Sequence, residues 1–177
     1  MDSTDPIAAK TQWTPLVPGG SNFVTHRLVQ LDARRFEMKP SAGLKLFGAA
    51  FLMGGIGTFV LGFLISEWMV SVFGLPFAAA GGYVLWPRAL VFDGVARLFT
   101  GKKGSVPFSG VHALQIVKET VTGSDHENYA SYELNLVLTT GERINVTDHA
   151  GLVQLREDAR KLSALLGCKV WDATASQ

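Results

Sequence analysis

The sequence predicts an integral membrane protein of the α+β class, in which a transmembrane helical hairpin is inserted into a β-rich domain. Three observations support this fold class. The 177-residue chain contains an apolar run from Leu46 to Trp86 with a single ionised side chain, Glu67. After this run, short segments of alternating polar and apolar residues are separated by turn residues, as in a β-rich domain. The last segment is an amphipathic helical pattern near the C-terminus.

Charged residues are distributed unevenly, although the formal net charge is only +1. All 16 Lys and Arg residues and 14 of the 15 acidic residues lie outside residues 46–86, so the apolar content is concentrated in one segment. The small net charge gives no reason to expect a nucleic-acid partner. Cys168 is the single cysteine, so no disulfide framework is expected. Residues 1–45 contain no apolar segment, and we therefore expect no cleavable secretory signal.

The apolar run is too long for one membrane span. As one helix it would measure ~61 Å, about twice the thickness of the hydrocarbon core of a bilayer. Division near Glu67 gives two spans of about one bilayer each, at about residues 46–65 and 69–86. The transmembrane hairpin as a whole is then expected at residues 41–87.

Glu67 has two interpretations. A carboxylate within the membrane costs several kcal/mol unless it is paired or protonated, and neither span contains a Lys, Arg or His to pair with it. A turn outside the membrane needs no such partner, and a Trp ring favours the interface. We therefore expect Ser66, Glu67 and Trp68 to form an extracytoplasmic turn. A turn at Gly74–Pro76 is disfavoured because it would place Arg88 in the second span.

Small residues recur at four-residue spacing along both spans. They are Ala50, Gly54, Thr58 and Gly62 on the first span, and Gly74, Ala78 and Gly82 on the second. Such ladders allow helix backbones to approach closely in lipid. Antiparallel pairing of the two ladders, with Gly54 opposite Ala78, places the midpoint of the hairpin at Ser66. A register shifted by four residues fits as well, and the ladders are also suited to homodimerisation.

Basic residues flank the hairpin on both sides, whereas its turn has none. They are Arg34, Arg35, Lys39 and Lys45 before the first span, and Arg88, Arg97, Lys102 and Lys103 after the second. By the positive-inside rule, both termini are cytoplasmic and Glu67 faces outward. We expect a multi-pass protein of the bacterial inner membrane. The Asn145-Val-Thr147 sequence would then lie on the cytoplasmic side and would not be glycosylated.

Strand patterns occur on both sides of the hairpin. Residues 1–21 are expected to form a flexible arm, and residues 22–40 to contribute two strands of the cytoplasmic β-domain. After the hairpin, residues 88–167 would complete the domain with five further strands. These are expected at residues 88–93, 95–100, 111–121, 132–138 and 143–147. Asp93-Gly94, between the first two of them, predicts a two-residue hairpin turn.

The last element is predicted to be a helix at about residues 150–166. Its apolar face is formed by Leu152, Leu155, Ala159, Leu162 and Leu166. Asp148 is the expected N-cap and Gly167 the expected C′ residue. The opposite face carries charges of both signs, which favours a position at the open end of the β-domain over one on the lipid surface. Residues 168–177 are expected to form a tail.

This order of seven strands and a C-terminal helix resembles the pleckstrin-homology-like fold as found in bacterial two-span membrane proteins. The resemblance covers residues 22–167 and rests on stretches such as VFDGVARLF and YELNLVLTTGERINV and on the terminal helix. It implies that a basic hairpin, here with Lys102 and Lys103, contacts phospholipid; an ordinary solvated turn is the alternative. In a second interpretation of the fold, residues 1–45 form an irregular arm and the β-domain consists only of residues after the second span.

The sequence contains no catalytic or metal-binding motif that we recognise. Asp125-His126-Glu127 and Asp148-His149 place acids beside imidazoles, but adjacent residues rarely converge on one metal ion. The GGIG sequence at residues 54–57 lacks the Lys and Ser/Thr of a phosphate-binding loop. Cys168 has no base beside it and is expected to be a packing residue. We therefore expect no catalytic residues, no bound metal and no cofactor.

The expected function is that of a non-enzymatic, membrane-anchored scaffold, assembly factor or accessory subunit. It would present the pleckstrin-homology-like domain at the cytoplasmic face. Its partners would be the lipid bilayer and either a membrane protein or a second copy of the chain, since exposed strand edges are available for strand addition. The alternative is a sensor that binds anionic lipid or a small ligand through the basic hairpin and the mouth of the β-domain.

Overall fold

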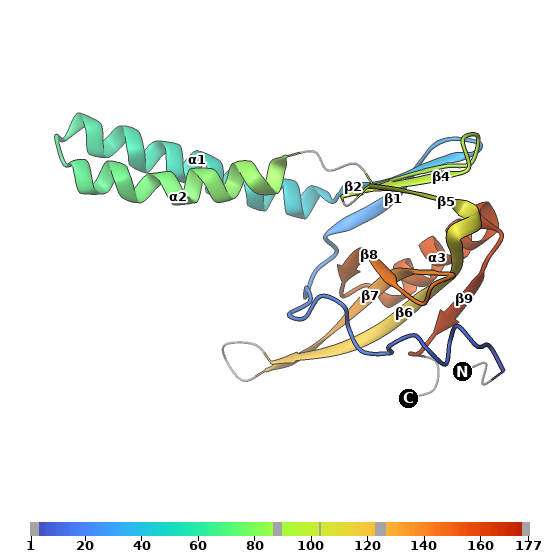
Figure 1. Cartoon of the computed structure of the whole chain (residues 1–177). Coiled ribbons are helices and arrows are strands. Elements are labelled where there is room, and N and C mark those ends of the chain that lie inside the picture. Colours follow the sequence, from blue (N-terminus) through green and yellow to red (C-terminus); the bar gives the residue numbers. More distant parts are fainter. Residues whose placement is uncertain (1–3, 87–89, 103, 123–126, 175–177) are drawn as a thin grey trace. The chain divides into compact units, whose positions relative to one another are not determined.

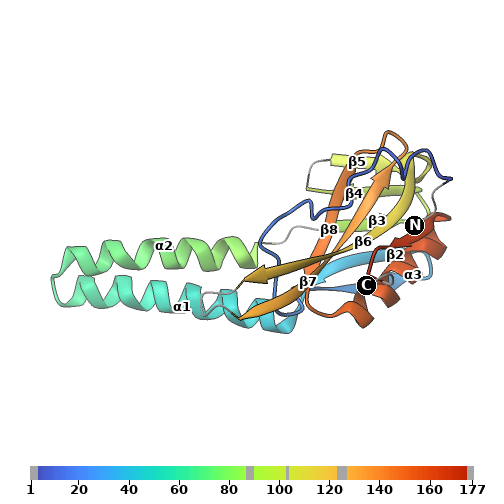
Figure 2. The same ribbon diagram turned by 90° about the horizontal axis from the view of Figure 1, so that it is seen from below.

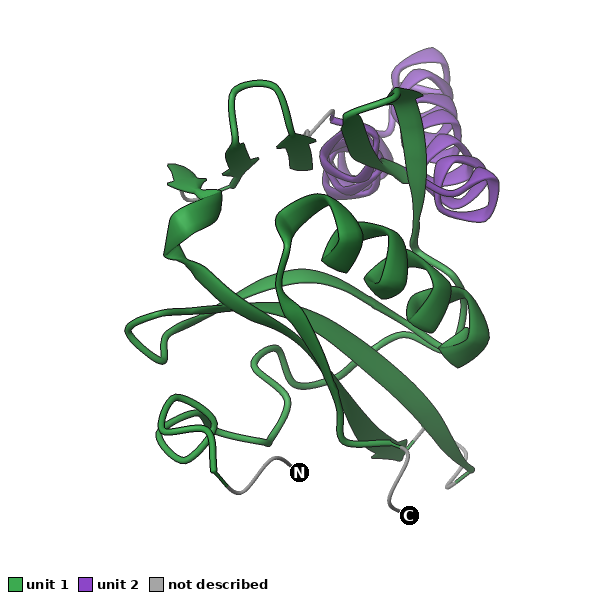
Figure 3. Ribbon diagram, turned by 90° about the vertical axis from the view of Figure 1, so that its right-hand side faces the viewer, with its two compact units in different colours: residues 1–39, 89–177 green, residues 40–88 purple. Residues whose placement is uncertain are grey.

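A computed structural model describes residues 4–86, 90–102, 104–122 and 127–174 and divides the chain into two compact units. The first, here called the β-unit, comprises residues 1–39 and 89–177, and the second, the hairpin unit, comprises residues 40–88 (Figure 3). The sequence placed the hairpin at residues 41–87. Two apolar helices, a third helix and two β-sheets make up the described fold, so the predicted α+β class is confirmed.

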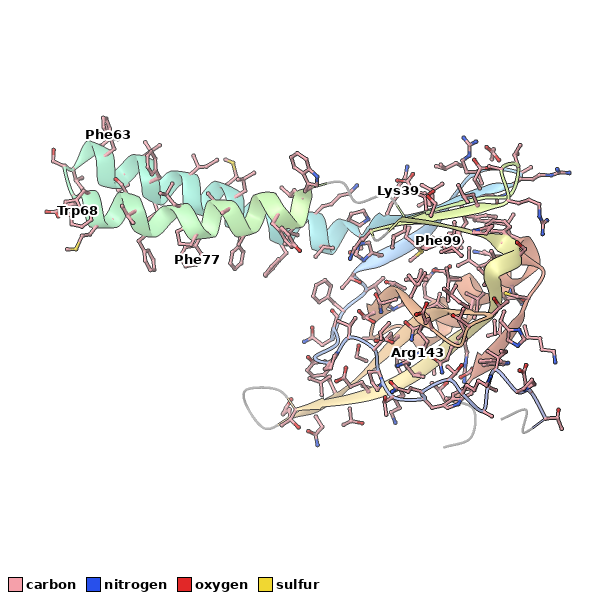
Figure 4. The ribbon with its side chains drawn as sticks, in the orientation of Figure 1. Lys39, Phe63, Trp68, Phe77, Phe99 and Arg143 are labelled. Atoms are coloured by element: carbon pink, nitrogen blue, oxygen red, sulfur yellow. The ribbon has the colours of Figure 1, made fainter. Side chains whose placement is uncertain are left out.

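The hairpin unit consists of two helices joined by a tight turn (Figure 1). They are α1 (Ala42–Leu64) and α2 (Trp68–Leu85). Both are long and apolar enough to cross a membrane, judged by length and composition. Large apolar side chains such as Phe63, Trp68 and Phe77 are exposed and point away from the hairpin (Figure 4). The outside of the hairpin unit is therefore apolar.

Glycines spaced seven residues apart form the contact between α1 and α2. The buried residues of the two helices are Gly48, Gly55 and Gly62 on α1, and Gly74 and Gly81 on α2. A Cβ added at Gly55 would lie 2.7 Å from both Ala78 Cα and Gly74 O, which leaves no room for a side chain. Gly74 and Ala78 on α2 and Gly62 on α1 belong to the predicted ladders and do lie at the contact.

The predicted four-residue spacing is wrong for other members of the ladders. Ala50 is exposed, and a Cβ added at Gly54 or Gly82 would meet no described atom within 4 Å. Four residues turn an α-helix by about 400°, so such a ladder drifts about 40° around the helix at each step. Seven residues return to within about 20° of the starting direction and keep the contact on one seam.

The turn of the hairpin lies where the sequence predicted it. The close approaches of Gly55 to Ala78 and of Gly62 to Ser71 place the midpoint between Ser66 and Glu67. Ser66 adopts a left-handed backbone conformation with φ 61°, and the Glu67 N–H donates to Gly62 O at 2.8 Å. Trp68 begins α2. The alternative turn at 74–76 is excluded, because these residues are helical.

The β-unit contains two sheets. The first has the order β1-β2-β3-β4-β5, and the second has the order β8-β7-β6-β9, with β9 parallel to β6. The strands of the first sheet are His26–Asp32, Arg35–Pro40, Leu90–Asp93, Leu98–Gly101 and Gly104–Pro107, for β1 to β5. Those of the second are Val111–Thr122, Asn128–Leu138, Arg143–His149 and Lys169–Asp172, for β6 to β9. A short 3-10 turn, Phe108–Gly110, leads from the first sheet to the second.

Helix α3 (Leu152–Leu166) lies between the two sheets and joins them into one core (Figure 3). Its predicted apolar face is buried, with Leu155 and Leu162 fully inaccessible. They share a cluster with Phe92 and Phe99 of the first sheet and with residues such as Leu114 of the second. The apolar face of the helix is thus part of the core of the β-unit, and charged residues such as Arg156 and Arg160 on its other face are exposed.

Two short strands were not predicted, so the described residues hold nine strands where about seven were expected. Strands β5 and β9 have four residues each, and neither lies beside an Asp-Gly signal like the one that marked the equally short β3 and β4. The expected tail is therefore wrong for Lys169–Asp172, where Trp171 is buried. Gly167, by contrast, ends helix α3 as predicted, since it adopts the left-handed conformation at φ 72°.

Two local predictions are wrong, namely the two-residue turn at Asp93-Gly94 and the N-cap at Asp148. The loop after β3 runs over four residues, 94–97, because the Asp93 carboxylate accepts the N–H groups of Val95 and Ala96, both at 2.9 Å. Arg97 then closes the loop in a left-handed conformation. Asp148 is not the N-cap of α3; it lies within β8, and Gly151 occupies the cap.

Candidate functional site

The N-terminal segment of the β-unit lies along the four-stranded sheet (Figures 1 and 2). Here residues 4–25 are called the arm. Trp13 packs on Trp171 with ring centroids 5.6 Å apart, and Ala8 is buried in the same cluster. Asp5 accepts a hydrogen bond from His112 Nε2 at 2.9 Å, which lowers the pKa of its carboxyl group. The segment expected to be flexible is thus held against β6 and β9.

Two carboxylates of the sheet hold the arm by its backbone. Glu133 on β7 is only 3% exposed and accepts the N–H groups of Leu16 and Val17, each at 2.8 Å. Glu119 on β6 accepts the two N–H groups of 19–20 at 3.0 and 3.1 Å. A hydrogen bond to a charged group contributes about 1.5–3 kcal/mol, so these four bonds form a clamp on the middle of the arm.

Neutral and basic side chains extend the clamp. Gln115 on β6 is fully buried and donates from Nε2 to Gln12 O at 3.0 Å. Arg143 on β8 donates from one terminal nitrogen to Thr14 O at 2.6 Å and to Gln115 Oε1 at 3.2 Å (Figure 4 labels Arg143). Buried polar groups need such partners. The arm therefore completes the outer face of this sheet.

A cavity of about 310 Å³ opens between the arm, the first sheet and β8. Its lining residues come from four elements of the β-unit: Leu16, Val17, Leu90, Lys102, Arg143, Ile144 and Asn145. Four of them are apolar, two are cationic, and none is acidic. A second, more open hollow of about 580 Å³ shares Leu16, Arg143 and Ile144 with it. The two therefore form neighbouring recesses along the arm.

Two lining residues of the cavity, Asn145 and Lys102, interact with titratable groups that also influence one another. Burial raises the pKa of Asp148 to about 6, against the hydrogen bond from Asn145 Nδ2 at 2.8 Å, and the nearby Glu133 raises it further. Burial also lowers the pKa of His149 to about 4, assisted by the neighbouring His26. The pKa of His26 is lowered by burial and by the positive charge of Lys102, which also lowers the pKa of Asp148.

The pKa shifts of Asp148 and His149 have opposite effects on how the stability of the β-unit depends on pH. Asp148 binds its proton more tightly in the folded state, so stability is lost as pH rises from 3.8 to about 6. His149 binds its proton more tightly in the unfolded state, so stability is lost as pH falls from 6.5 to about 4. Neutral His149 accepts the Gly151 N–H through Nδ1 at 3.0 Å. Over pH 4–6 the changes in stability that these two adjacent residues cause therefore nearly cancel.

The remaining candidate residues fall into three groups. Lys102 lines the cavity, whereas Lys103 and the Asp125-His126 pair lie outside the described residues. Burial raises the pKa of Cys168 to about 11, which makes its thiol a poor nucleophile at neutral pH. Within the described ranges, no group of three or more His, Cys, Asp and Glu side chains could hold a metal ion.

Sequence reasoning missed the clamp residues Glu119, Glu133 and Arg143. The signal that could have found Glu119 and Glu133 is the occurrence of polar residues at alternate positions of the two long strands β6 and β7; Arg143 lies on the shorter β8. On β7 these positions include Glu133 and Asn135, and both are buried. A buried polar face of this kind requires hydrogen-bond partners from elsewhere in the chain.

No family model, curated protein or solved structure matches the chain. Its function is accordingly inferred from its own geometry and chemistry.

Proposed function

We propose that the chain is a non-enzymatic, membrane-anchored scaffold, assembly factor or accessory subunit of a membrane complex. Its hairpin unit crosses the bacterial inner membrane twice, and its β-unit is a pleckstrin-homology-like domain at the cytoplasmic face. The observation that carries the proposal is the surface of the hairpin unit, in which glycines occupy the helix contact and large apolar side chains face outward.

This surface is suited to lipid and costly in water. Side chains such as Leu46, Phe63 and Leu64 are between 73% and 76% exposed. Each square ångström of apolar surface costs about 25 cal/mol in water, and monomeric soluble proteins rarely expose apolar patches above a few hundred Å². A bilayer removes this cost. Close glycine contact is also the packing that helices use in lipid, where burial of apolar surface does not drive association.

Aromatic residues lie at both ends of α2, as expected for a span between two interfaces. Trp68 begins the helix and is 71% exposed, while Tyr83 and Trp86 lie at its other end with 64% and 70% exposure. The 18 residues of α2 give a length of about 27 Å, close to the hydrocarbon thickness. Lys45 near the start of α1 carries the positive charge expected on the cytoplasmic side, and the turn at Glu67 has no Lys or Arg.

The β-unit offers strand edges for binding. Among its buried polar groups, Glu133 and Gln115 hold the arm. Strands β1 and β5 end the first sheet, and β8 and β9 end the second. Such strand edges suit the addition of a strand from another protein. Purification in mild detergent should recover a stoichiometric membrane-protein partner or a defined homo-oligomer; a partner-free monomer would count against the scaffold role.

The topology is tested by cysteine labelling in a Cys168→Ser background. A membrane-impermeant maleimide added to intact spheroplasts should label Glu67→Cys, which lies at the turn of the hairpin unit. It should label Arg160→Cys, on the exposed face of α3, only after permeabilisation. Labelling in the reverse order would overturn the orientation, and release of the protein by alkaline carbonate would overturn the membrane location.

A further inference from the structure

We propose that the 310 Å³ cavity of the β-unit binds a single-chain anionic amphiphile, namely a carboxylate with an acyl chain of about eight carbons. The headgroup lies against Lys102 and Arg143, and the chain lies between the apolar side chains of the arm, β3 and β8. This binding site is independent of the scaffold role.

The composition of the walls selects an amphiphile. Leu16 and Val17 come from the arm, Leu90 from β3 and Ile144 from β8, so apolar groups from three elements face one space. Pockets of this kind, mostly apolar with few polar groups, are typical of small-ligand sites. A purely polar ligand would leave these walls without a partner.

The two cations select an anion. No acidic residue lines the cavity, and within the described ranges neither Lys102 nor Arg143 forms an ion pair. Arg143 is held in place by Thr14 O and Gln115 Oε1 through one terminal nitrogen, so its guanidinium is pre-oriented. A fixed guanidinium and a nearby ammonium suit a carboxylate, since charge-assisted hydrogen bonds are the strong ones.

The volume sets the length of the chain. At about 30 Å³ for each water-sized group, 310 Å³ holds about ten such groups. Octanoate has about this number of non-hydrogen atoms.

Two arm residues that the clamp holds, Leu16 and Val17, also line the site. Glu133 holds the backbone N–H groups of Leu16 and Val17, whose side chains form one wall of the cavity. An occupant of the cavity therefore contacts the arm in its docked position. Because binding to one state stabilises that state, the ligand should protect the arm, and a docked arm should strengthen ligand binding.

Equilibrium dialysis of labelled octanoate against the full chain in zwitterionic nanodiscs, with empty nanodiscs as the blank, tests the site. We expect saturable binding that weakens about tenfold in Lys102→Ala, which removes one charge-assisted contact without touching the arm. Arg160→Ala, on the exposed face of α3, removes one positive charge elsewhere and should bind like the wild type. Val17→Trp should abolish binding, because Val17 is 46% exposed and a larger side chain can fill the cavity from outside.

Three results in zwitterionic nanodiscs would overturn the proposal. They are no uptake above empty nanodiscs, equal affinity in Lys102→Ala and Arg160→Ala, and equal binding of octyltrimethylammonium, which has the same chain and the opposite charge. Near-ultraviolet circular dichroism checks that each variant is folded. Nanodiscs that contain phosphatidylglycerol separate a free acid from a bilayer lipid: undisturbed octanoate binding supports the free single-chain acid, and displacement of octanoate would overturn it in favour of a two-chain anionic lipid.

Discussion

The contact between α1 and α2 can be tested with two neighbouring glycines. A Cβ at Gly55 would lie 2.7 Å from Ala78 Cα and from Gly74 O, whereas ordinary contact begins at 3.4 Å. The helices must therefore separate by more than half an ångström in Gly55→Ala. A Cβ at Gly54 would meet no described atom within 4 Å, so Gly54→Ala is the matched control. The two variants differ only in the face of α1 that receives the methyl group.

The expected effects have opposite signs. A radial gap of 0.5–1 Å removes a quarter to a half of each van der Waals contact, and overpacking typically costs about 1–3 kcal/mol. Gly54→Ala removes a residue of low helix propensity without a clash and should gain up to about 1 kcal/mol. The free energies of unfolding of the two variants should thus differ by about 2 kcal/mol or more.

Titration with sodium dodecyl sulfate from zwitterionic micelles measures this difference. Pyrene labels on Val60→Cys and Phe73→Cys, in a Cys168→Ser background, report the separation of the two helices by loss of excimer emission. Gly55→Ala should shift the midpoint to lower detergent fractions, and Gly54→Ala should not. Equal shifts, or a larger shift for Gly54→Ala, would refute the seven-residue contact and restore the four-residue ladder.

Two further predictions concern the β-unit. Asp148→Asn should raise its free energy of unfolding at pH 7 by up to about 3 kcal/mol and leave a stability that falls as pH drops from 6.5 to about 4, since His149 then titrates alone. Urea titrations at several pH values, followed by tryptophan fluorescence, check this, and parallel curves for variant and wild type would contradict it. Glu133→Gln should accelerate trypsin cleavage after Lys10 about tenfold by loosening the arm, whereas the exposed Glu157→Gln should not; equal rates would disprove the clamp.

The sequence predicted the position of the hairpin turn but not the face of each helix that makes the contact. The position follows from span length and from the lone charge at Glu67, which are properties of the whole segment. Which face of each helix makes the contact depends on a small rotation of the helix about its axis. Both four- and seven-residue spacings of small residues occur in the same span and predict different faces. Gly55 belongs to the seven-residue set and Gly54 to the four-residue set, one residue apart. Only the geometry of close approach separates them.

The strands that the sequence predicted either have enough residues for alternation or, like the four-residue β3 and β4, lie beside the Asp93-Gly94 turn signal. Long strands such as β6 and β7 lie near their predicted positions, whereas β9 depends on its pairing with β6 and on the burial of Trp171 under Trp13. These are contacts between residues distant in the chain. A four-residue segment has no local pattern strong enough to predict them.

Residues 1–21 were expected to form a flexible arm, and this is the difference with the largest consequence for function. The arm is ordered by the sheet on which it lies. There Glu133 and Gln115 are buried on strands whose outer face would meet water without the arm. Removal of the arm would leave these groups without their partners and remove Leu16 and Val17 from the cavity wall. The buried polar face, the docked arm and the ligand cavity therefore depend on one another, and a change at any one of them should alter the other two.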